Sequence, residues 1–186
     1  MVRLFQAGDS EAFGELYQRY KTVALRSAYL LTGSYCDSEN VLQETFLKCY
    51  QHLRTLKKPE RFRAWFFRIL TRTAWEYCRK GSRECPMEHI WEACQGRLPQ
   101  ERSALEAACE AEERRELAAA IDRLPLKQKT VVVLYYYNEL SVQEIAGICG
   151  VLPGTVKSRL YNARQRLQEM LTAREREEYG AGQPEQ

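Results

Sequence analysis

The stretch that decides the fold is Ser141–Leu167, which reads SVQEIAGICGVLPGTVKSRLYNARQRL. It opens on Ser141 and, three residues later, Glu144, a pair that caps the start of a helix by reciprocal hydrogen bonds. An apolar inner face follows, made of Ile145, Ala146 and Ile148. Gly150 then permits a sharp change of direction. The stretch therefore predicts a helix of two turns followed by a tight turn.

A second helix is predicted from Pro153 to about residue 171, because proline is well tolerated at the first position of a helix. Its inward face has helical spacing and consists of Val156, Leu160, Ala163, Leu167 and Leu171. A short helix, a turn and a longer helix together form a helix–turn–helix.

The surface of this second helix is basic, with no acidic residue between Pro153 and Gln168. Its cations are Lys157, Arg159, Arg164 and Arg166, and its neutral hydrogen-bonding residues are Thr155, Ser158, Tyr161 and Asn162. Cations hold phosphates, and shorter polar side chains reach base edges, so the pattern is typical of a helix that enters the DNA major groove. The alternative is an exposed basic helix face on a protein that does not bind DNA.

Five further helices are predicted upstream, three before residue 81 and two over about 112–124 and 127–138. The first starts near Ser10 and ends at Gly33, the second opens near Asp37, and the third covers about 60–80. The buried stripe of the second helix is predicted to consist of Leu42, Thr45, Phe46, Cys49, Tyr50 and Leu53. The third has a stripe that includes Phe62, Trp65 and Phe66, interpreted as core. Thr130–Val133 has four β-branched residues, which favour a strand, but its helical neighbours favour a helix.

The charge changes along the chain. Residues 1–83 carry 15 Lys and Arg against 8 Asp and Glu, residues 84–111 carry 2 against 6, residues 112–172 carry 9 against 7, and residues 173–186 carry 2 against 4. Periodicity is lost in the acidic stretch. We therefore expect an all-α protein of two small helical domains, 1–83 and 112–173, joined by a flexible linker, 84–111, and followed by a flexible tail, 174–186.

A second basic surface surrounds the third helix. Ten Lys and Arg lie between Arg54 and Arg83, against two acids, and Trp75 stands among them. Unpaired bases stack on aromatic rings while cations pair with phosphates, so this pattern is typical of single-stranded nucleic-acid binding. A solvated basic face is the alternative. The outward face of the second helix, with Leu47 between polar residues, indicates a weaker candidate for a protein contact.

Little in the sequence indicates catalysis, a cofactor or a bound metal. Seven cysteines include no C-x-x-C pair, and we interpret them as free thiols. Cys85, His89 and Cys94 have the spacing of metal ligands, interpreted as coincidence because a fourth ligand is lacking. The longest purely apolar run, Val131–Tyr137, is too short to span a membrane, and we expect a cytoplasmic protein without membrane insertion.

Four motifs in order resemble those of bacterial extracytoplasmic-function sigma factors. They are DSENVLQETFL at 37–47, FRAWFFRI at 62–69, LPLKQ at 124–128 with Ile145-Ala146, and GTVKSRL at 154–160. The resemblance implies a non-enzymatic transcription initiation factor whose partners are core RNA polymerase, promoter DNA and an anti-sigma factor. It also implies that 1–83 is region 2 and 112–173 is region 4. A stand-alone helix–turn–helix regulator, or a redox sensor that uses the cysteines, is the rival interpretation.

The resemblance assigns three groups of residues. Core polymerase would contact Asn40, Gln43, Glu44, Leu47 and Lys48. The minus-ten element would be read and melted by Lys57, Lys58, Arg61, Arg63, Arg68, Arg72, Trp75 and Arg79. The minus-thirty-five element would be read by Thr155, Lys157, Ser158, Arg159, Tyr161, Asn162, Arg164 and Arg166. Asn40 stands where the family usually has Asp, which removes a charge from the polymerase-binding face. Arg72, Glu76 and the pair Tyr161-Asn162 also depart from the usual family residues, so base preferences at the minus-ten and minus-thirty-five elements are expected to differ.

Overall fold

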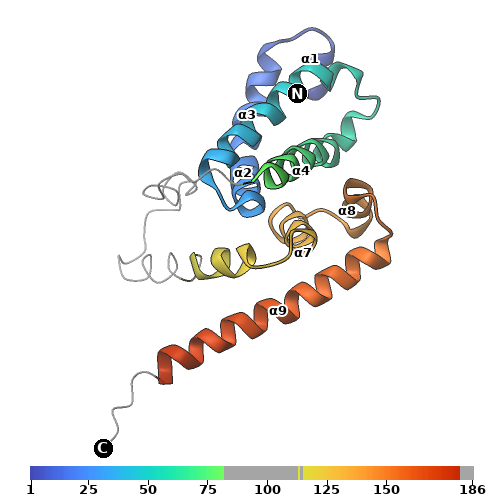
Figure 1. The fold of residues 1–186 in the computed structure, drawn as a ribbon. Helices are drawn as coiled ribbons and strands as arrows, with labels where there is room; N and C mark the ends of the chain where they lie inside the picture. Colours follow the sequence, from blue (N-terminus) through green and yellow to red (C-terminus); the bar gives the residue numbers. More distant parts are fainter. Residues whose placement is uncertain (82–112, 114, 181–186) are drawn as a thin grey trace, which may run out of the picture.

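A computed structural model describes the backbone of residues 1–81, 113 and 115–180, and side chains as far as residue 173. All regular structure in these ranges is helical, as the sequence predicts. Figure 1 shows the N-terminal helices on one side, the long C-terminal helix on the other, and α7 and α8 between them. The expected linker, 84–111, lies outside the described residues.

The N-terminal domain is a bundle of helices with two short 3₁₀ turns. Its elements are α1 (Val2–Gln6), α2 (Glu11–Thr32), α3 (Tyr35–His52), η1 (Leu53–Thr55), η2 (Pro59–Arg61) and α4 (Phe62–Lys80). The predicted stop at Gly33 is confirmed, since this residue has the left-handed conformation, φ 71°, that lets a chain leave a helix. The core includes Leu31, Val41 and Phe66, all essentially inaccessible to solvent.

Three sequence expectations for this bundle need correction. Helix α3 begins earlier than predicted, because the Ser34 side chain, rather than one at 37–39, accepts a hydrogen bond from the Asp37 backbone N–H. Tyr50, assigned to the buried stripe, is half exposed. Trp65 is only partly buried and packs its ring against Phe62 at a centroid distance of 5.9 Å. Helix α1 was not predicted.

The C-terminal domain contains a helix over residues 115–122, α7 (Leu126–Val132), the π-helix η3 (Val133–Tyr137), α8 (Val142–Cys149) and α9 (Pro153–Gly180). The Thr130–Val133 run is helical, as predicted, although its local propensity favours a strand. Its four side chains are fully buried, and burial within a helical domain outweighs a propensity of about 1 kcal/mol. Helix α9 continues to Gly180, so the first residues of the predicted tail, 174–186, are helical.

The helix–turn–helix forms as predicted. Ser141 accepts a hydrogen bond from the Glu144 backbone N–H while the Glu144 carboxylate accepts one from the Ser141 backbone N–H, which completes the capping box. Gly150 ends α8 in the left-handed conformation, φ 67°. Beneath the turn, Ile145, Val156 and Ala163 are inaccessible to solvent, so α8 and α9 share one apolar core.

The two domains pack against each other. Helix α4 contacts α8, and α2 contacts both α7 and η3. Buried apolar side chains of both domains belong to one continuous cluster. The faces of α2 and α4 that point toward the C-terminal domain are therefore covered.

Candidate nucleic-acid interface

The outward face of α9 is neutral at its centre. Ser158, Tyr161 and Asn162 are exposed, and they lie opposite the buried Val156 and Leu160. Gln165 is also exposed and falls on the same face, four residues after Tyr161. Gln165 was not among the residues assigned from the sequence, although the assigned Arg164 and Arg166 flank it; its spacing from Ser158 and Tyr161 was the available signal.

Cations line the two flanks of this neutral face. Helical spacing puts Lys157 and Arg164 on one flank and Arg159 and Arg166 on the other. Arg159 is half buried and lowers the pKa of Cys149, whereas burial, the larger effect, raises it. Neutral hydrogen-bonding groups between two rows of positive charge match a groove floor between two phosphate backbones.

Arg164 also takes part in an apolar groove. Its guanidinium lies 5.7 Å from the centroid of the Tyr136 ring, within the range of a cation–π contact. The groove has a volume of about 570 Å³ and runs between the helix over 115–122, η3 and α9. Its lining includes Leu117, Val132 and Leu167. Arg164 therefore lies beside apolar surface as well as beside the neutral outward face of α9.

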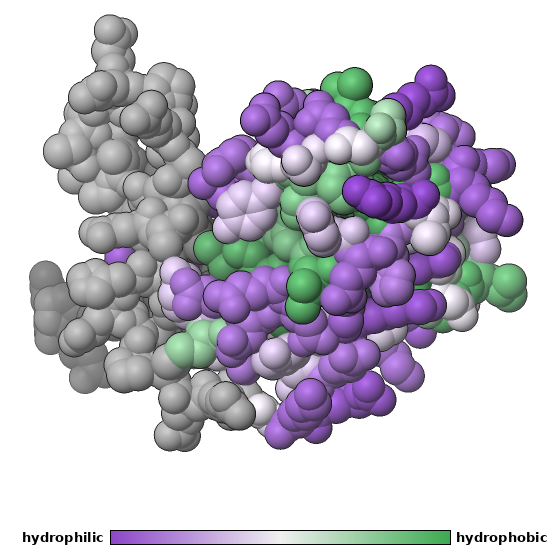
Figure 2. Space-filling model, turned by 90° about the horizontal axis from the view of Figure 1, so that it is seen from above, coloured by the Kyte–Doolittle hydropathy of each residue, from purple (hydrophilic) through white to green (hydrophobic). Residues whose placement is uncertain are grey.

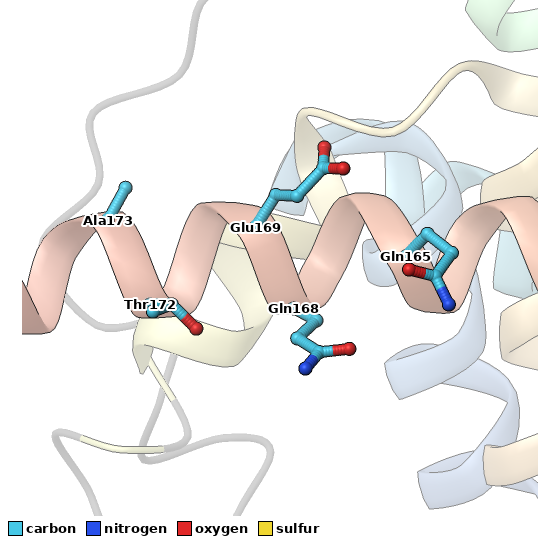
Figure 3. A pocket seen from close by; sticks show the side chains of 5 residues that line it. All are labelled: Gln165, Gln168, Glu169, Thr172 and Ala173. Atoms are coloured by element: carbon cyan, nitrogen blue, oxygen red, sulfur yellow. The ribbon is translucent and has the colours of Figure 1, made fainter.

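The basic character of α9 ends in its middle. Beyond Arg166 the described side chains are neutral or acidic, among them Gln168, Glu169 and Thr172. Figure 3 shows these residues with Gln165 and Ala173 on successive turns of α9, where they line a cavity of about 390 Å³. The surface suited to DNA is therefore the N-terminal half of the helix.

On α4, four cations and Trp75 share one helix face. Arg61 precedes the helix, and Arg68, Arg72, Trp75 and Arg79 follow at separations of seven, four, three and four residues, which keep them on one side. The four arginines are exposed and Trp75 is partly buried. Arg63, assigned to the same group, projects from a different side of α4. The structure thus brings together five of the eight residues assigned to minus-ten DNA.

The loop before α4 carries Lys57 and Lys58, both exposed. It is held in place by α1, because the Gln6 side-chain nitrogen donates hydrogen bonds to the backbone oxygens of Leu53, at 3.1 Å, and Leu56, at 2.9 Å. Phe5, which is 1% exposed, anchors α1 in the bundle. Gln6 was not among the residues assigned from the sequence. Apolar residues at positions 2 and 5 were the signal for α1, although such a helix is short.

The outward face of α3 presents the residues assigned to core polymerase. Gln43 and Leu47 are exposed, and Asn40 and Glu44 are partly exposed. Lys48 instead turns toward α4, where its Nζ lies 2.7 Å from Glu44 and donates to Thr73 Oγ1 at 3.1 Å. Viewed from above, hydrophobic side chains reach the surface among hydrophilic ones (Figure 2). Leu47 and Tyr50 are among the exposed hydrophobic residues, at 58% and 50%.

The cysteines of the described residues offer no reactive thiolate. Burial raises the pKa of Cys49 to about 12 and also raises the pKa values of Cys78 and Cys149, so all three are protonated at neutral pH. The expectation of free thiols is confirmed for these three but wrong for Cys36, which is disulfide-bonded. Within the described ranges no group of His, Cys, Asp and Glu could hold a metal. The Cys85, His89 and Cys94 pattern lies outside them.

Three of the residues assigned to minus-ten DNA contact the C-terminal domain. An Arg63 guanidinium nitrogen donates to the Asn138 backbone oxygen, Arg68 donates to the Gly147 backbone oxygen at 2.7 Å, and the Trp75 ring N–H donates to Thr130 Oγ1 at 3.0 Å. A sequence cannot reveal this engagement, because it depends on residues 55 to 79 positions away in the chain.

Each of the two domains matches a known protein family. Residues 16–84 match the family model for sigma-70 region 2, and residues 114–167 match that for sigma-70 region 4. The ECF RNA polymerase sigma-E factor of Escherichia coli K12 is 32% identical over 174 residues, which cover 89% of each chain. This chain belongs to the ECF RNA polymerase sigma factors. Sigma factors direct RNA polymerase to promoters and are not enzymes, so the redox-sensor and stand-alone regulator interpretations are set aside.

Solved structures share the fold of this sigma factor. CnrH, in complex with the cytosolic domain of CnrY, superposes with a TM-score of 0.67 at 24% identity, covering 92% of this chain and 95% of CnrH. RpoE of Bartonella quintana, in complex with the anti-sigma factor NepR, gives 0.64 at 23% identity, covering 85% and 97%. No described helix of this sigma factor has both the length and the apolar character that a membrane crossing requires.

Proposed function

We propose that region 4 of this sigma factor reads the minus-thirty-five element with the N-terminal half of α9. Ser158, Tyr161, Asn162 and Gln165 face the base edges, and Lys157, Arg159 and Arg166 hold the phosphates on either side, with Thr155 near the helix start. Arg164 contributes less than the other cations, because its guanidinium stacks on Tyr136. The neutral face between two basic flanks is the observation that carries this proposal.

Region 2 reads and melts the minus-ten element with α4 and the loop before it. Lys57, Lys58 and Arg61 approach the backbone from the loop, and Arg68, Arg72, Trp75 and Arg79 from the helix, with Arg63 beside them. An unpaired base stacked on Trp75 is worth about 1–3 kcal/mol. In the holoenzyme, Trp75→Ala should therefore reduce permanganate reactivity of the minus-ten thymines on a promoter that the wild type opens. The matched control is Trp65→Phe, which keeps an aromatic ring against Phe62. Unchanged melting with Trp75→Ala contradicts this role.

Core polymerase binds the outward face of α3 through Asn40, Gln43, Glu44 and Leu47. Lys48 forms an ion pair with Glu44 and so helps to position the Glu44 side chain on this face. The two functional units are 1–83 and 112–173, and 84–111 connects them. Binding to core can be measured by competition with a labelled sigma factor, where Leu47→Ala should weaken binding and Glu15→Ala, on the exposed side of α2, should not.

The complex of Bartonella quintana RpoE with the anti-sigma factor NepR, and that of CnrH with the cytosolic domain of CnrY, support a further partner, an anti-sigma factor that holds this sigma factor in the cytoplasm until a signal releases it. Coexpression with candidate anti-sigma factors tests this through loss of transcription.

One experiment tests the function as a whole. The full chain is combined with bacterial core polymerase, and transcribed promoters are selected from a random library. We expect a bipartite motif with two conserved elements at a fixed spacing. Failure to bind core, or transcripts without a common motif, contradicts the proposal.

A further inference from the structure

The interface between the domains uses residues that the proposed function gives to DNA. Arg63 binds the Asn138 backbone oxygen and also lies 3.5 Å from the Glu139 carboxylate. Arg68 binds the Gly147 backbone oxygen. Trp75 binds Thr130. Each side chain meets an oxygen of region 4, and α8 lies against the helix that carries all three.

These oxygens have the chemistry of a nucleic-acid backbone. A guanidinium binds phosphate because phosphate offers negatively charged or partially negative oxygen acceptors. Carbonyl oxygens at the ends of η3 and within α8, and the carboxylate of Glu139, offer similar acceptors to Arg63 and Arg68. One guanidinium cannot keep these hydrogen bonds and also direct the same N–H groups at a phosphate.

Asn138 fixes this arrangement from within. It is inaccessible to solvent, and its side-chain nitrogen donates to Ser27 Oγ of α2 at 2.7 Å. Its side-chain oxygen has no hydrogen-bond partner in the described structure. Within the described residues, the bond to Ser27 is therefore the one side-chain hydrogen bond that this fully buried amide makes, and it crosses from region 4 to region 2. Losing it leaves the amide unpaired in the packed state but hydrated when the domains separate.

The backbone around Asn138 departs from regular helix. The π-helix η3 ends at Tyr137, and Glu139 has a φ of 47°, which a residue other than glycine rarely adopts. This turn aims the Asn138 backbone oxygen and the Glu139 carboxylate at Arg63 while the Asn138 side chain points to Ser27. Such conformations persist where the surrounding contacts maintain them.

We propose that region 4 competes with promoter DNA for α4 within the same chain, with the Asn138–Ser27 hydrogen bond as the latch of the closed state. Arg63, Arg68 and Trp75 become available to minus-ten DNA only when this latch opens. The inference rests on the proposed function of α4, but the closed state itself can be measured without DNA.

The first test measures opening directly. Fluorescent labels are introduced at Glu15 and Glu169, both exposed, by unnatural amino acids so that the native cysteines stay unchanged. Ser27→Ala removes the acceptor of the Asn138 side chain, and the open population should rise at least about fivefold. Ser38→Ala is the matched control, because Ser38 is equally buried and its hydroxyl donates within its own helix, to the Tyr35 oxygen.

The second test measures competition. The free full chain is titrated with a fluorescent single-stranded DNA 20-mer of mixed sequence. When only the open state offers α4, the apparent affinity scales with the open fraction, so Ser27→Ala should tighten binding by the same factor as it opens the chain. Adding Arg68→Gln should remove that gain. Glu139→Gln should give a smaller gain of about twofold, because the Arg63–Glu139 pair is largely exposed.

Each result of these two tests either supports or overturns the proposal. Unchanged label distances with Ser27→Ala overturn the latch. Opening of the chain without tighter DNA binding overturns the competition. If Ser27→Ala and Ser38→Ala raise the open population equally, the opening is due to general destabilisation, which also overturns the latch. If instead a holoenzyme carrying Lys57→Ala and Lys58→Ala melts promoters normally, the proposed role of the minus-ten surface fails, whatever the labels report.

Discussion

The two basic surfaces of this sigma factor have similar composition but different surroundings. On α9 the cations flank an exposed neutral face, and the helix packs on its own domain through its apolar side. On α4, Arg68 and Trp75 of the basic face, with Arg63 beside it, are hydrogen-bonded to the other domain. A basic, aromatic sequence pattern therefore indicates a surface suited to nucleic acid but does not reveal whether that surface is accessible in the free chain.

The largest expected effect comes from the core that supports both surfaces. Ile145 is inaccessible to solvent in α8, the helix that contacts both α4 and α9. Ile145→Ala should lower the free energy of unfolding by about 2–5 kcal/mol. Urea denaturation measures this, with Gln143→Ala on the exposed side of α8 as control, where a change within about 0.5 kcal/mol is expected. A loss below 1 kcal/mol for Ile145→Ala would show that α8 supports neither surface.

The next prediction separates base reading from phosphate binding on α9. Asn162→Ala should change base preference at one position of the minus-thirty-five element, by about 1–3 kcal/mol of discrimination. Arg166→Ala, on the flank, should weaken binding to all sequences alike. Promoter selection with each variant holoenzyme measures both effects. A preference change with Arg166→Ala and none with Asn162→Ala would reverse the two assignments.

A smaller effect tests the difference between α4 and α9 in the free chain. One lost phosphate contact decreases the steepness of the negative slope of log affinity against log salt by about 0.9. For binding of the free full chain to duplex DNA, Lys157→Ala should show this decrease. Arg68→Ala should leave the slope unchanged, because the Arg68 guanidinium is bonded to Gly147. Equal decreases for both variants would remove the contrast between the two surfaces.

The smallest effect concerns the cap of α8. Hydrogen bonds from the Ser141 side chain and backbone lower the pKa of Glu144 below its ordinary value of 4.5. The carboxylate therefore stabilises the folded state above pH 4.5, and this contribution is lost as the pH falls through the lowered pKa. Because Glu144 is exposed, the contribution should stay below about 1 kcal/mol. Urea midpoints between pH 7 and pH 3 should fall more steeply for the wild type than for Glu144→Gln; parallel curves would contradict this.

The all-helical fold and most helix positions could be predicted from local signals. The capping box of Ser141 and Glu144, the stop at Gly33 and the apolar spacing of α9 act within a few residues, where sequence patterns are informative. Tyr50 was misplaced because it stands at the lateral edge of its helical stripe, where the packing of neighbouring helices decides burial. Helix α1 was missed because five residues do not form a stable helix without the tertiary contact of Phe5.

The site was harder to predict than the fold. The cations and Trp75 were identified by composition, but the partners of Arg63, Arg68 and Trp75 depend on how the two domains pack. Lys48 was assigned to a free surface, although α4 supplies Thr73 and Glu76 within its reach. Gln6 gave no signal, because a single glutamine becomes informative only when the backbone oxygens that it binds are known.

The grip of Gln6 on the loop before α4 bears on how promoter preference can diversify. Gln6 binds the backbone oxygens of Leu53 and Leu56, and a backbone oxygen is present whatever side chain a position carries. Substitutions at neighbouring exposed positions such as Lys57 and Lys58 can therefore alter the promoter contacts proposed for the loop without releasing the loop from the bundle. The side chains of this loop can therefore change by mutation while the backbone conformation of the loop is kept.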